Sequence, residues 1–334
     1  MKKFNQVIDL AKLPYFKANE SGTGLIYKGK DKNFIDFHTH VGGSYLLGRP
    51  IDWLAEGKTQ TFFPISGKPI DLSHYSAFDF DKKMIAECRK ETLRPIYSNT
   101  GINATHTFPN LIREMTALGF EKTVVLAIDI RTSGNSRRLL KTAPNFKKQV
   151  IPFVSVHPKS IQAAARLKRH AENGARGLKI HPTVQMVRPA DRKTISLVRL
   201  AGELGLPVIF HCGNSPLSPK PQELFNRMED FEKCIREAPE TTIILGHSGM
   251  NEYKIAIKIA EKYPRVYLEL SGQPPAAIKD MIKHLGDDRL LFGSDWPYYP
   301  IALPMAKVLL ATEDKPKSRQ KIMQGNARKL LKLK

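Results

Sequence analysis

The sequence contains few cysteines and no spacing that would join them. Its three cysteines, Cys88, Cys212 and Cys234, form an odd set without a CxxC pair. Neither a disulfide framework nor a thiolate zinc site is therefore expected, and we expect three small buried side chains. No apolar run reaches about 18 residues, and charges interrupt the start of the chain before a signal-peptide core could form. The sequence therefore predicts a cytoplasmic protein.

Acidic residues are scarce relative to basic ones. The chain has 32 Asp and Glu against 53 Lys and Arg, which gives a formal net charge of +21. Such an excess can attract nucleic acid, anionic lipid or an acidic small molecule. Apart from a cluster from Lys315 to Lys334, the basic residues are spread over most expected helices, as on exposed helix faces. We therefore expect a solvated surface and an anionic small-molecule substrate, and neither a membrane nor nucleic acid as partner.

Short apolar runs recur along the 334 residues and alternate with helical stretches. This alternation indicates βα repeats and a parallel sheet. Eight such runs occur, the number of strands that a closed (β/α)8 TIM barrel needs, so an α/β barrel is the expected fold. The runs cover residues 34–40, 123–129, 150–157, 175–181, 207–211, 242–247, 266–270 and 290–295.

No linker points to a second domain, so we expect one barrel domain over residues 1–334. Residues 1–33 are expected to form an extension with a small hairpin around residues 21–24. Residues 41–122 form a long insertion between the first two strands, and we expect it to cover the barrel mouth. A homo-oligomer is in keeping with common symmetric assemblies, but no interface can be identified.

Apolar residues at helical spacing predict the helices between the strands. Leu224, Met228, Phe231 and Ile235 recur at steps of three and four, which predicts one apolar helix face. Asn326 precedes the last helical stretch and is expected to cap it with its side chain.

Histidines and one aspartate mark the ends of several expected strands. His38 and His40 lie two residues apart, so both project to one side of the first strand. His211, His247 and Asp295 close three further runs, and the carboxyl ends of barrel strands meet on the active-site face. Imidazole and carboxylate ligands suit Zn, Mn, Fe or Co, with one position left for water or substrate.

Lys179 lies in the fourth expected strand and points into the barrel. Burial of an ammonium is unfavourable without a partner. An ion pair or a substrate contact is one explanation. Carbamylation by CO2, which converts the cation into a carboxylate able to bridge two metals, is another, and simple exposure is the third.

This order of residues resembles the amidohydrolase superfamily. The shared features are HxH on the first strand, lysine on the fourth, histidine on the fifth and sixth, and aspartate on the eighth. More narrowly, the segments 211–213, 246–249, 293–297 and 325–327 look like the amidohydrolase-related branch that also contains aminocarboxymuconate-semialdehyde decarboxylase. The resemblance implies a metal-dependent enzyme that holds a divalent ion, zinc in the first place with Mn, Fe or Co as alternatives.

The resemblance also implies roles for the site residues. In a mononuclear site, which we favour, His38, His40, His211 and Asp295 bind one ion. Asp295 also handles the proton of the attacking water, and His247 acts as an acid or base near the substrate. In a binuclear site, carbamylated Lys179 bridges two ions, and His211 and His247 hold the second.

Other residues at strand ends have weaker claims to function. His157 and His181 each precede a proline and are expected to bond the backbone. For Asp129 and Glu269, structural ion pairing is expected rather than catalysis.

Residues in the loops could shape the substrate pocket. Arg49 and Arg131 could grip a carboxylate, although exposed arginines are the simpler interpretation. The aromatic residues Trp296, Tyr298 and Tyr299 follow Asp295 and are expected to wall the pocket.

Four functions follow from these features. The first is hydrolysis of an amide, a lactone or another carboxylic ester by an activated water. Nonoxidative decarboxylation of an unsaturated or aromatic acid is the alternative that the narrower resemblance implies. A TatD-like deoxyribonuclease would suit the positive charge, but that group has a glutamate where Lys179 stands. A barrel that only binds an anionic partner is the remote fourth.

Overall fold

Eight parallel strands form one sheet in the order β12-β11-β10-β9-β8-β7-β6-β4 in the computed structural model. The structure describes residues 3–45, 50–64, 68–77, 81–215, 217 and 220–333. The strands are β4 (Phe34–Thr39), β6 (Phe120–Leu126), β7 (Val150–Ser155), β8 (Gly177–Ile180), β9 (Val208–His211), β10 (Ile243–Gly246), β11 (Val266–Glu269) and β12 (Leu290–Leu291). All eight coincide with the expected runs, although several are shorter and β6 begins at Phe120, directly after the left-handed Gly119 (φ +81°).

The sheet curls round so that its first strand meets the segment after its last. Backbone hydrogen bonds run from Phe37 N to Phe292 O (2.8 Å) and from His40 N to Trp296 O (2.7 Å). Thr39 also forms an isolated parallel bridge with Trp296. These bonds bring the two edges of the sheet together, and the predicted (β/α)8 barrel is confirmed.

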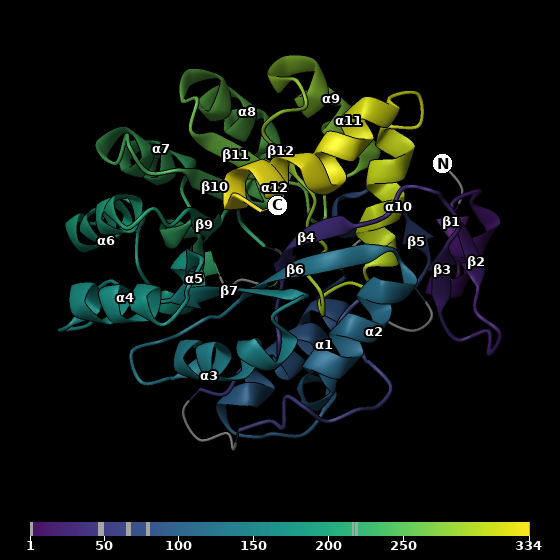
Figure 1. Cartoon of the computed structure of the whole chain (residues 1–334), viewed down its shortest axis with the longest axis horizontal. Coiled ribbons are helices and arrows are strands. Elements are labelled where there is room, and N and C mark those ends of the chain that lie inside the picture. The colour runs from purple at the N-terminus through teal and green to yellow at the C-terminus, as the bar shows by residue number, and fades with distance from the viewer. Residues whose placement is uncertain are drawn as a thin grey trace.

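Helices surround the strands as a ring (Figure 1). Apolar residues on the inner face of each helix pack against the sheet, as a βα repeat requires. The helices after the strands are α3 (Asn135–Thr142), α4 (Ala163–Glu172), α6 (Arg192–Glu203), α7 (Met228–Glu237), α8 (Tyr253–Lys262), α9 (Pro275–Leu285) and α10 (Ala302–Ala311). None of the helices in the described part of the chain is long and apolar enough to span a membrane.

The N-terminal extension and the segment after β4 add further strands and helices to the barrel. In the extension, β2 (Phe16–Ala18) and β3 (Leu25–Tyr27) pair as an antiparallel hairpin, as expected. The strand β1 (Lys3–Phe4) pairs with β5 (Ile70–Asp71), which follows β4 in the chain. The same long segment contains α1 (Lys82–Leu93) and α2 (Phe108–Ala117).

The barrel interior is a separate apolar cluster. Phe37, Phe153, Ile209 and Ile244 pack inside it with neighbours from the other strands, and Leu331 from α12 (Asn326–Leu331) joins them. In Figure 1 the yellow α12 lies across the middle of the ring of strands. The chain end therefore covers one end of the barrel, and the opposite end is left for the site.

Two local expectations were wrong. Leu224 lies in a 3-10 turn before α7 and is 62% exposed, because Arg227 is extended (φ −69°, ψ 130°) and interrupts the helix. Asn326 does not cap a helix, since the preceding turn is continuous with α12. Its side chain instead donates to Asp287 O (2.6 Å) and Leu290 O (2.8 Å), so it ties the last helix to β12.

The cysteines fit their expected role. Cys88, Cys212 and Cys234 are all unpaired and at most 4% exposed. They act as small core side chains.

Candidate metal centre and active site

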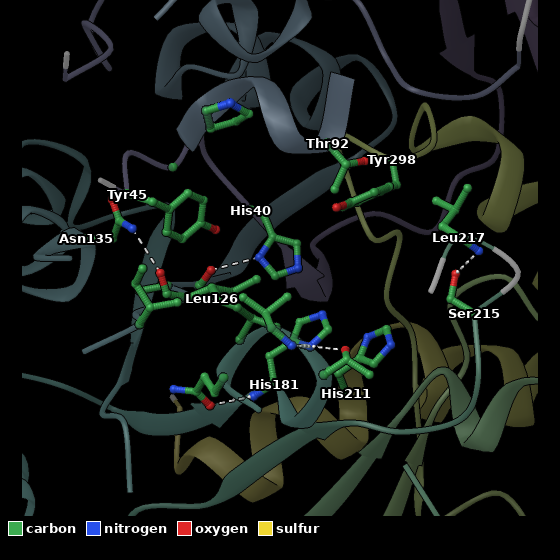
Figure 2. Close-up of a pocket in the computed structure, with 18 of the residues that line it drawn as sticks. His40, Tyr45, Thr92, Leu126, Asn135, His181, His211, Ser215, Leu217 and Tyr298 are labelled. Atoms are coloured by element: carbon green, nitrogen blue, oxygen red, sulfur yellow. Dashed lines mark hydrogen bonds between the residues drawn. The ribbon is translucent and has the colours of Figure 1, made fainter. Parts of the chain in front are cut away.

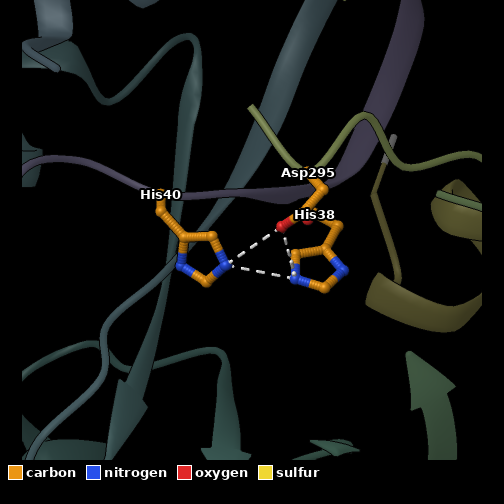
Figure 3. A group of neighbouring side chains, drawn as sticks. All are labelled: His38, His40 and Asp295. Atoms are coloured by element: carbon orange, nitrogen blue, oxygen red, sulfur yellow. Dashed lines mark hydrogen bonds and ion pairs between the residues drawn. The ribbon is translucent and has the colours of Figure 1, made fainter. Parts of the chain in front are cut away.

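His38, His40 and Asp295 meet at the carboxyl ends of the strands (Figure 3). The two Nε2 atoms are 3.2 Å apart, and each lies 3.5 Å from Asp295 Oδ1. His38 and His40 come from one strand and its end, as their spacing predicts, while Asp295 follows β12 at the closure of the barrel. Three donor atoms from the first and last strand segments thus face one small space.

Acceptors behind the two histidines fix their ring tautomers. His38 Nδ1 lies 2.6 Å from Glu269 Oε2, and His40 Nδ1 donates to Leu126 O over 2.8 Å. Since a carbonyl and a carboxylate can only accept, the proton sits on Nδ1 of both rings. Both Nε2 atoms therefore present lone pairs to the space beside Asp295, the arrangement that a carboxylate behind a metal-binding histidine produces.

Gly293 lets the Glu269 carboxylate approach His38. A Cβ at Gly293 would lie 2.7 Å from His38 Cβ and would also strike Glu269 Oε1. Asp36 adds a second tie, because its Oδ1 accepts from His38 N (3.1 Å) and Ser294 N (2.9 Å). The motif before Asp295 therefore serves close packing of the first strand against the last.

Backbone strain is concentrated at the site. His247 and Asp295 both have a φ of 57°, in the left-handed region that residues other than glycine rarely adopt. His247 directly follows β10, and Asp295 lies in the segment after β12 that closes the barrel. Such strain is kept where the surroundings impose it, and it commonly marks functional positions.

A chain of hydrogen bonds links Glu269 to His211. Ser271 Oγ donates to Glu269 Oε2 (2.9 Å) and lies 2.7 Å from His247 Nδ1. Because the single hydroxyl proton goes to the carboxylate, His247 Nδ1 must be the donor to Ser271. His247 Nε2 is then an acceptor for His211 Nδ1, 3.1 Å away.

The end of this chain is an orphaned nitrogen. His211 Nε2 is buried and has no hydrogen-bond partner among the described residues. A buried acceptor of this kind calls for a ligand. His211 does not, however, come within 4.8 Å of all three members of the His38, His40 and Asp295 group.

Burial keeps these imidazoles neutral. It lowers the pKa of His38, His211 and His247 well below the ordinary value, and the Lys179 charge adds to this at His38. Neutral imidazoles are the form that binds metal ions.

Lys179 lies inside the barrel next to the cluster. It is fully buried, and its Nζ is 3.3 Å from His38 Nε2. Burial lowers the pKa of Lys179 to about 8, and the charges of Asp295 and Glu269 oppose that shift. Simple exposure is thus excluded, and two explanations remain: an ion pair or substrate contact, and a carbamate.

A pocket of about 910 Å³ opens above the cluster. Its lining includes His40, His211, His247 and Asp295, and Figure 2 shows His40 and His211 in it with Tyr45 and Tyr298 alongside. Phe62 stacks on Tyr298 with ring centroids 4.6 Å apart and 17° between the ring planes. Apolar, aromatic walls around a few polar groups are typical of small-molecule sites.

The aromatic residues after Asp295 divide into two groups. Tyr298 and Tyr299 line the pocket, as expected. Trp296 does not, because it is fully buried and donates from Nε1 to Glu114 Oε2 over 3.0 Å. Its role is in packing.

Basic side chains lie at the pocket. Arg131 is exposed and lines it, as does Lys159, whose Nζ is 3.0 Å from Asp191. Arg49 lies outside the described residues. Among the residues that the structure places in the lining, Asp295 is the single carboxylate.

The remaining strand-end candidates have structural bonds. His157 Nε2 donates to Gln185 O (2.9 Å), as expected. His181 Nδ1 accepts from Val184 N (3.4 Å), and its ring stacks on His211 at 4.0 Å in the pocket. Asp129 accepts from Asn135 N (2.7 Å) and so anchors the start of α3 rather than an ion pair.

Two contributors were not recognised from the sequence. Glu269 was expected to form an ion pair. Its fully buried carboxylate instead accepts hydrogen bonds from His38 Nδ1 and from Ser271 Oγ, which leads on to His247. Tyr75 lines the pocket from the segment between β4 and α1, where no periodicity signalled a role.

The donor set fits a divalent cation. Three Nε2 lone pairs and one carboxylate are the ligand types that Zn and its neighbours prefer, and the orphaned His211 Nε2 is the fourth candidate beside the group of three.

Comparisons with known proteins place the chain in a family. The model of the family described as Amidohydrolase matches residues 95–333. No curated protein sequence matches the chain.

Solved structures share the fold at low sequence identity. An uncharacterised TIM-barrel protein from Bordetella bronchiseptica is 20% identical with a TM-score of 0.64, over 90% of this chain and 98% of that one. The 5-carboxyvanillate decarboxylase from Sphingomonas paucimobilis is 14% identical with a TM-score of 0.62, over 91% and 100%. An amidohydrolase from Burkholderia multivorans with bound zinc is 13% identical with a TM-score of 0.59, over 90% and 99%. With its barrel, its donor cluster and the match over residues 95–333, this chain belongs to the amidohydrolase family of metal-dependent enzymes.

Proposed function

We propose that this enzyme hydrolyses an amide, a lactone or another carboxylic ester of an anionic small molecule. The observation that carries the proposal is the convergence of His38 Nε2, His40 Nε2 and Asp295 Oδ1 within 3.5 Å beneath the pocket. The solved amidohydrolase with bound zinc supports a zinc ion in this place. His211, whose Nε2 lacks a protein partner among the described residues, is proposed as the fourth ligand.

A divalent ion held here would polarise a substrate carbonyl and lower the pKa of water from 15.7 to about 7. Asp295 borders both the cluster and the pocket, so its carboxylate is the proposed acceptor of the proton from the attacking water. Its backbone is left-handed, with a φ of 57°, at the place where its carboxylate meets the two histidines. The apolar walls exclude competing water and strengthen each charge interaction inside the pocket.

We propose two roles for His247, positioning of His211 and proton exchange. Its bonds to Ser271 (2.7 Å) and His211 (3.1 Å) hold His211 in the tautomer that leaves Nε2 free. Because His247 also lines the pocket, we propose that its Nε2 gives up the bond from His211 once substrate is bound and then exchanges a proton with the leaving group. Replacement of His247 by glutamine separates these roles. Loss of one limb of the pH profile of kcat indicates proton exchange, and weaker zinc binding alone indicates positioning.

Lys179 is proposed to act as an ammonium that attracts the developing negative charge. Its Nζ is 3.3 Å from His38 Nε2 and is fully buried. One ion and an unmodified lysine remain the favoured state, and carbamylation with a second ion is the alternative.

The pocket indicates the class of substrate. A volume of about 910 Å³ is near the upper end for drug-sized ligands, about 300 to 1,000 Å³. The aromatic walls favour a planar or unsaturated body, and Arg131 with Lys159 favours a carboxylate directed to the rim.

Decarboxylation is the second candidate, and the apolar lining of the pocket favours it. A substrate carboxylate placed among Tyr298, Phe62 and the other rings would lose its hydration, and CO2 release removes that cost. The structural similarity to 5-carboxyvanillate decarboxylase points in the same direction.

One experiment separates the two reactions. Purified protein supplied with zinc is incubated with a panel of aromatic lactones, amides and esters, and with the corresponding free aromatic acids. Hydrolysis predicts new carboxylate without CO2, whereas decarboxylation predicts CO2 from the free acids alone. No turnover of any lactone, amide or ester would overturn the hydrolytic proposal.

A further inference from the structure

The long segment after β4 places Tyr75 in the pocket wall. Tyr75 lines the pocket together with His247 and Asp295. It starts a short 3-10 turn, η2 (Tyr75–Ala77), in which Ser76 has a φ of 53°. Ser76 N donates to Gly272 O over 2.8 Å, so the turn is bonded to the loop that follows β11.

The loop makes room for the tyrosine ring at Gly272. A Cβ at Gly272 would lie 2.9 Å from Tyr75 Cζ and 3.0 Å from its Oη. Gly272 also has a φ of +78°, which disfavours any residue with a side chain. The Tyr75 ring therefore packs directly against the backbone of Gly272, and its hydroxyl also lies at this contact.

A buried lysine fastens the two segments together. Lys307 of α10 is 1% exposed, and its Nζ donates to His74 O and to Gly272 O, each over 2.9 Å. Within the described ranges Lys307 has no ion-pair partner. Its ammonium donates to these two carbonyls, and burial of the charge costs free energy because it removes hydration.

The same loop carries the residues that bond to the back of the His38, His40 and Asp295 group. Glu269 and Ser271 precede Gly272, and Gln273 donates to His247 O over 2.7 Å. Tyr75 is thus fixed to the same loop that orients His38 and His247. This connection gives the phenol a fixed position relative to Asp295.

The Tyr75 hydroxyl remains a donor. Burial, followed by the charges of Tyr299 and Asp295, raises the pKa of Tyr75 well above its ordinary value. A protonated phenol in an apolar pocket can donate a hydrogen bond to a negatively charged oxygen.

We propose that Tyr75 is a catalytic residue that donates a hydrogen bond to a substrate oxygen, and that Lys307 is the positioning residue that holds it in place. The inference rests on the proposed function only in requiring that this pocket binds the substrate. It applies to hydrolysis and to decarboxylation, because the substrates of both reactions carry a carbonyl or carboxylate oxygen that can accept this hydrogen bond.

The first test compares Tyr75→Phe with Tyr267→Phe. Tyr267 lies in β11 outside the pocket lining, so this control removes the same hydroxyl from the strand that leads to the loop. Tyr75→Phe is expected to lower kcat by about 10- to 100-fold with little change in KM or zinc content. Equal kinetics for the two variants would overturn the proposal.

The second test moves the ring without removing it. Gly272→Ala places a methyl group against Tyr75, whereas Gly205→Ala imposes a similar backbone strain (φ +69°) with no atom within 4 Å of the new Cβ. Only Gly272→Ala is expected to lower kcat, and the combined Tyr75→Phe and Gly272→Ala variant is expected to lose little more than the worse single variant. Losses that multiply would show that Gly272 acts independently of Tyr75.

Lys307→Met tests the positioning role in the same way. Its loss of kcat is expected to overlap with that of Tyr75→Phe in the double variant, since both remove one interaction. Full multiplication of the two losses would overturn the role of Lys307, and if Lys307→Met does not fold, the Gly272 series decides.

Failure of the proposed function is distinguishable from failure of this inference. If the wild type turns over no compound, calorimetric titration with benzoate replaces kinetics. Tyr75→Phe is then expected to weaken benzoate binding by about 5- to 10-fold relative to Tyr267→Phe. Equal affinities, or no binding of benzoate to the wild type, would overturn the assignment of Tyr75.

Discussion

The Nε2 atoms of His38 and His40 lie 3.2 Å apart, and both present lone pairs because each ring donates from Nδ1 to the acceptor behind it. Two lone pairs cannot bond to each other, so a shared cation would stabilise the pair. Replacement of either histidine by alanine is expected to remove the bound metal and to lower kcat/KM by more than about 100-fold. Metal content by mass spectrometry and steady-state kinetics measure both effects.

The control for this prediction is His284→Ala. His284 is exposed on α9 and lies 3.4 Å from Glu261, remote from the cluster. It should leave metal content and rate unchanged. A His38→Ala variant that keeps its metal would contradict the assignment of the ligands.

Glu269→Gln tests the carboxylate behind the metal cluster. The amide keeps the size of the side chain but weakens its bonds to His38 Nδ1 and Ser271 Oγ. Zinc affinity is expected to fall by about 10- to 100-fold. Competition with a chromogenic chelator gives the affinity directly.

Asp129→Asn is the matched control, since Asp129 is also a buried carboxylate at a strand end. It binds the backbone at the start of α3, at Asn135 N (2.7 Å) and Ser136 N (2.9 Å). It should cost about 1 to 3 kcal/mol of stability and leave zinc affinity intact. Equal zinc affinity in both variants would refute the role of Glu269.

Lys307 predicts a pH dependence of stability. Burial lowers its pKa to about 7, against the charge of Asp71, whereas an unfolded lysine titrates near about 10.4. Between these values the unfolded chain holds the extra proton, so the free energy of unfolding of the wild type should rise with pH relative to Lys307→Met. Below about 7 both states are protonated and the full burial cost is present. Urea unfolding at pH 6.5 and pH 9 measures this, and curves for the two proteins that shift in parallel would be the contrary result.

Arg131 is expected to attract the substrate without taking part in the reaction. Its exposed guanidinium lies at the pocket, where screening limits its effect. Arg131→Ala should raise KM for a carboxylate substrate by about 2- to 5-fold at low salt and leave kcat unchanged. The difference should vanish at high salt, and a lower kcat would instead place Arg131 at the reacting atoms.

The barrel and most of the cluster could be predicted from the sequence because both depend on local patterns. The expected strand runs of five to eight residues stand out by their apolar composition, and His38, His40 and Asp295 lie at or near the ends of such runs. In a barrel these ends converge whatever the loops do. The meeting of these three residues therefore follows from topology alone.

Residues whose role depends on tertiary contacts could not be predicted. Glu269 resembles any charged residue at a strand end until Gly293 allows it to reach His38. Tyr75 and Lys307 come from a segment without periodicity and from an apolar helix, and only the folded chain brings them to Gly272. Leu224 has the helical spacing, but the backbone at Arg227 is extended. The helix α7 therefore begins at Met228 and does not include Leu224.

Metal content per chain, measured together with the state of Lys179 in a high-resolution crystal structure, tests the central claim most directly. Wild-type protein is predicted to hold one divalent ion and an unmodified Lys179, and a His38→Ala and His40→Ala double variant is predicted to hold none. Two ions with a carbamylated lysine would contradict the mononuclear site. A wild type that binds no ion yet remains active would contradict the account as a whole.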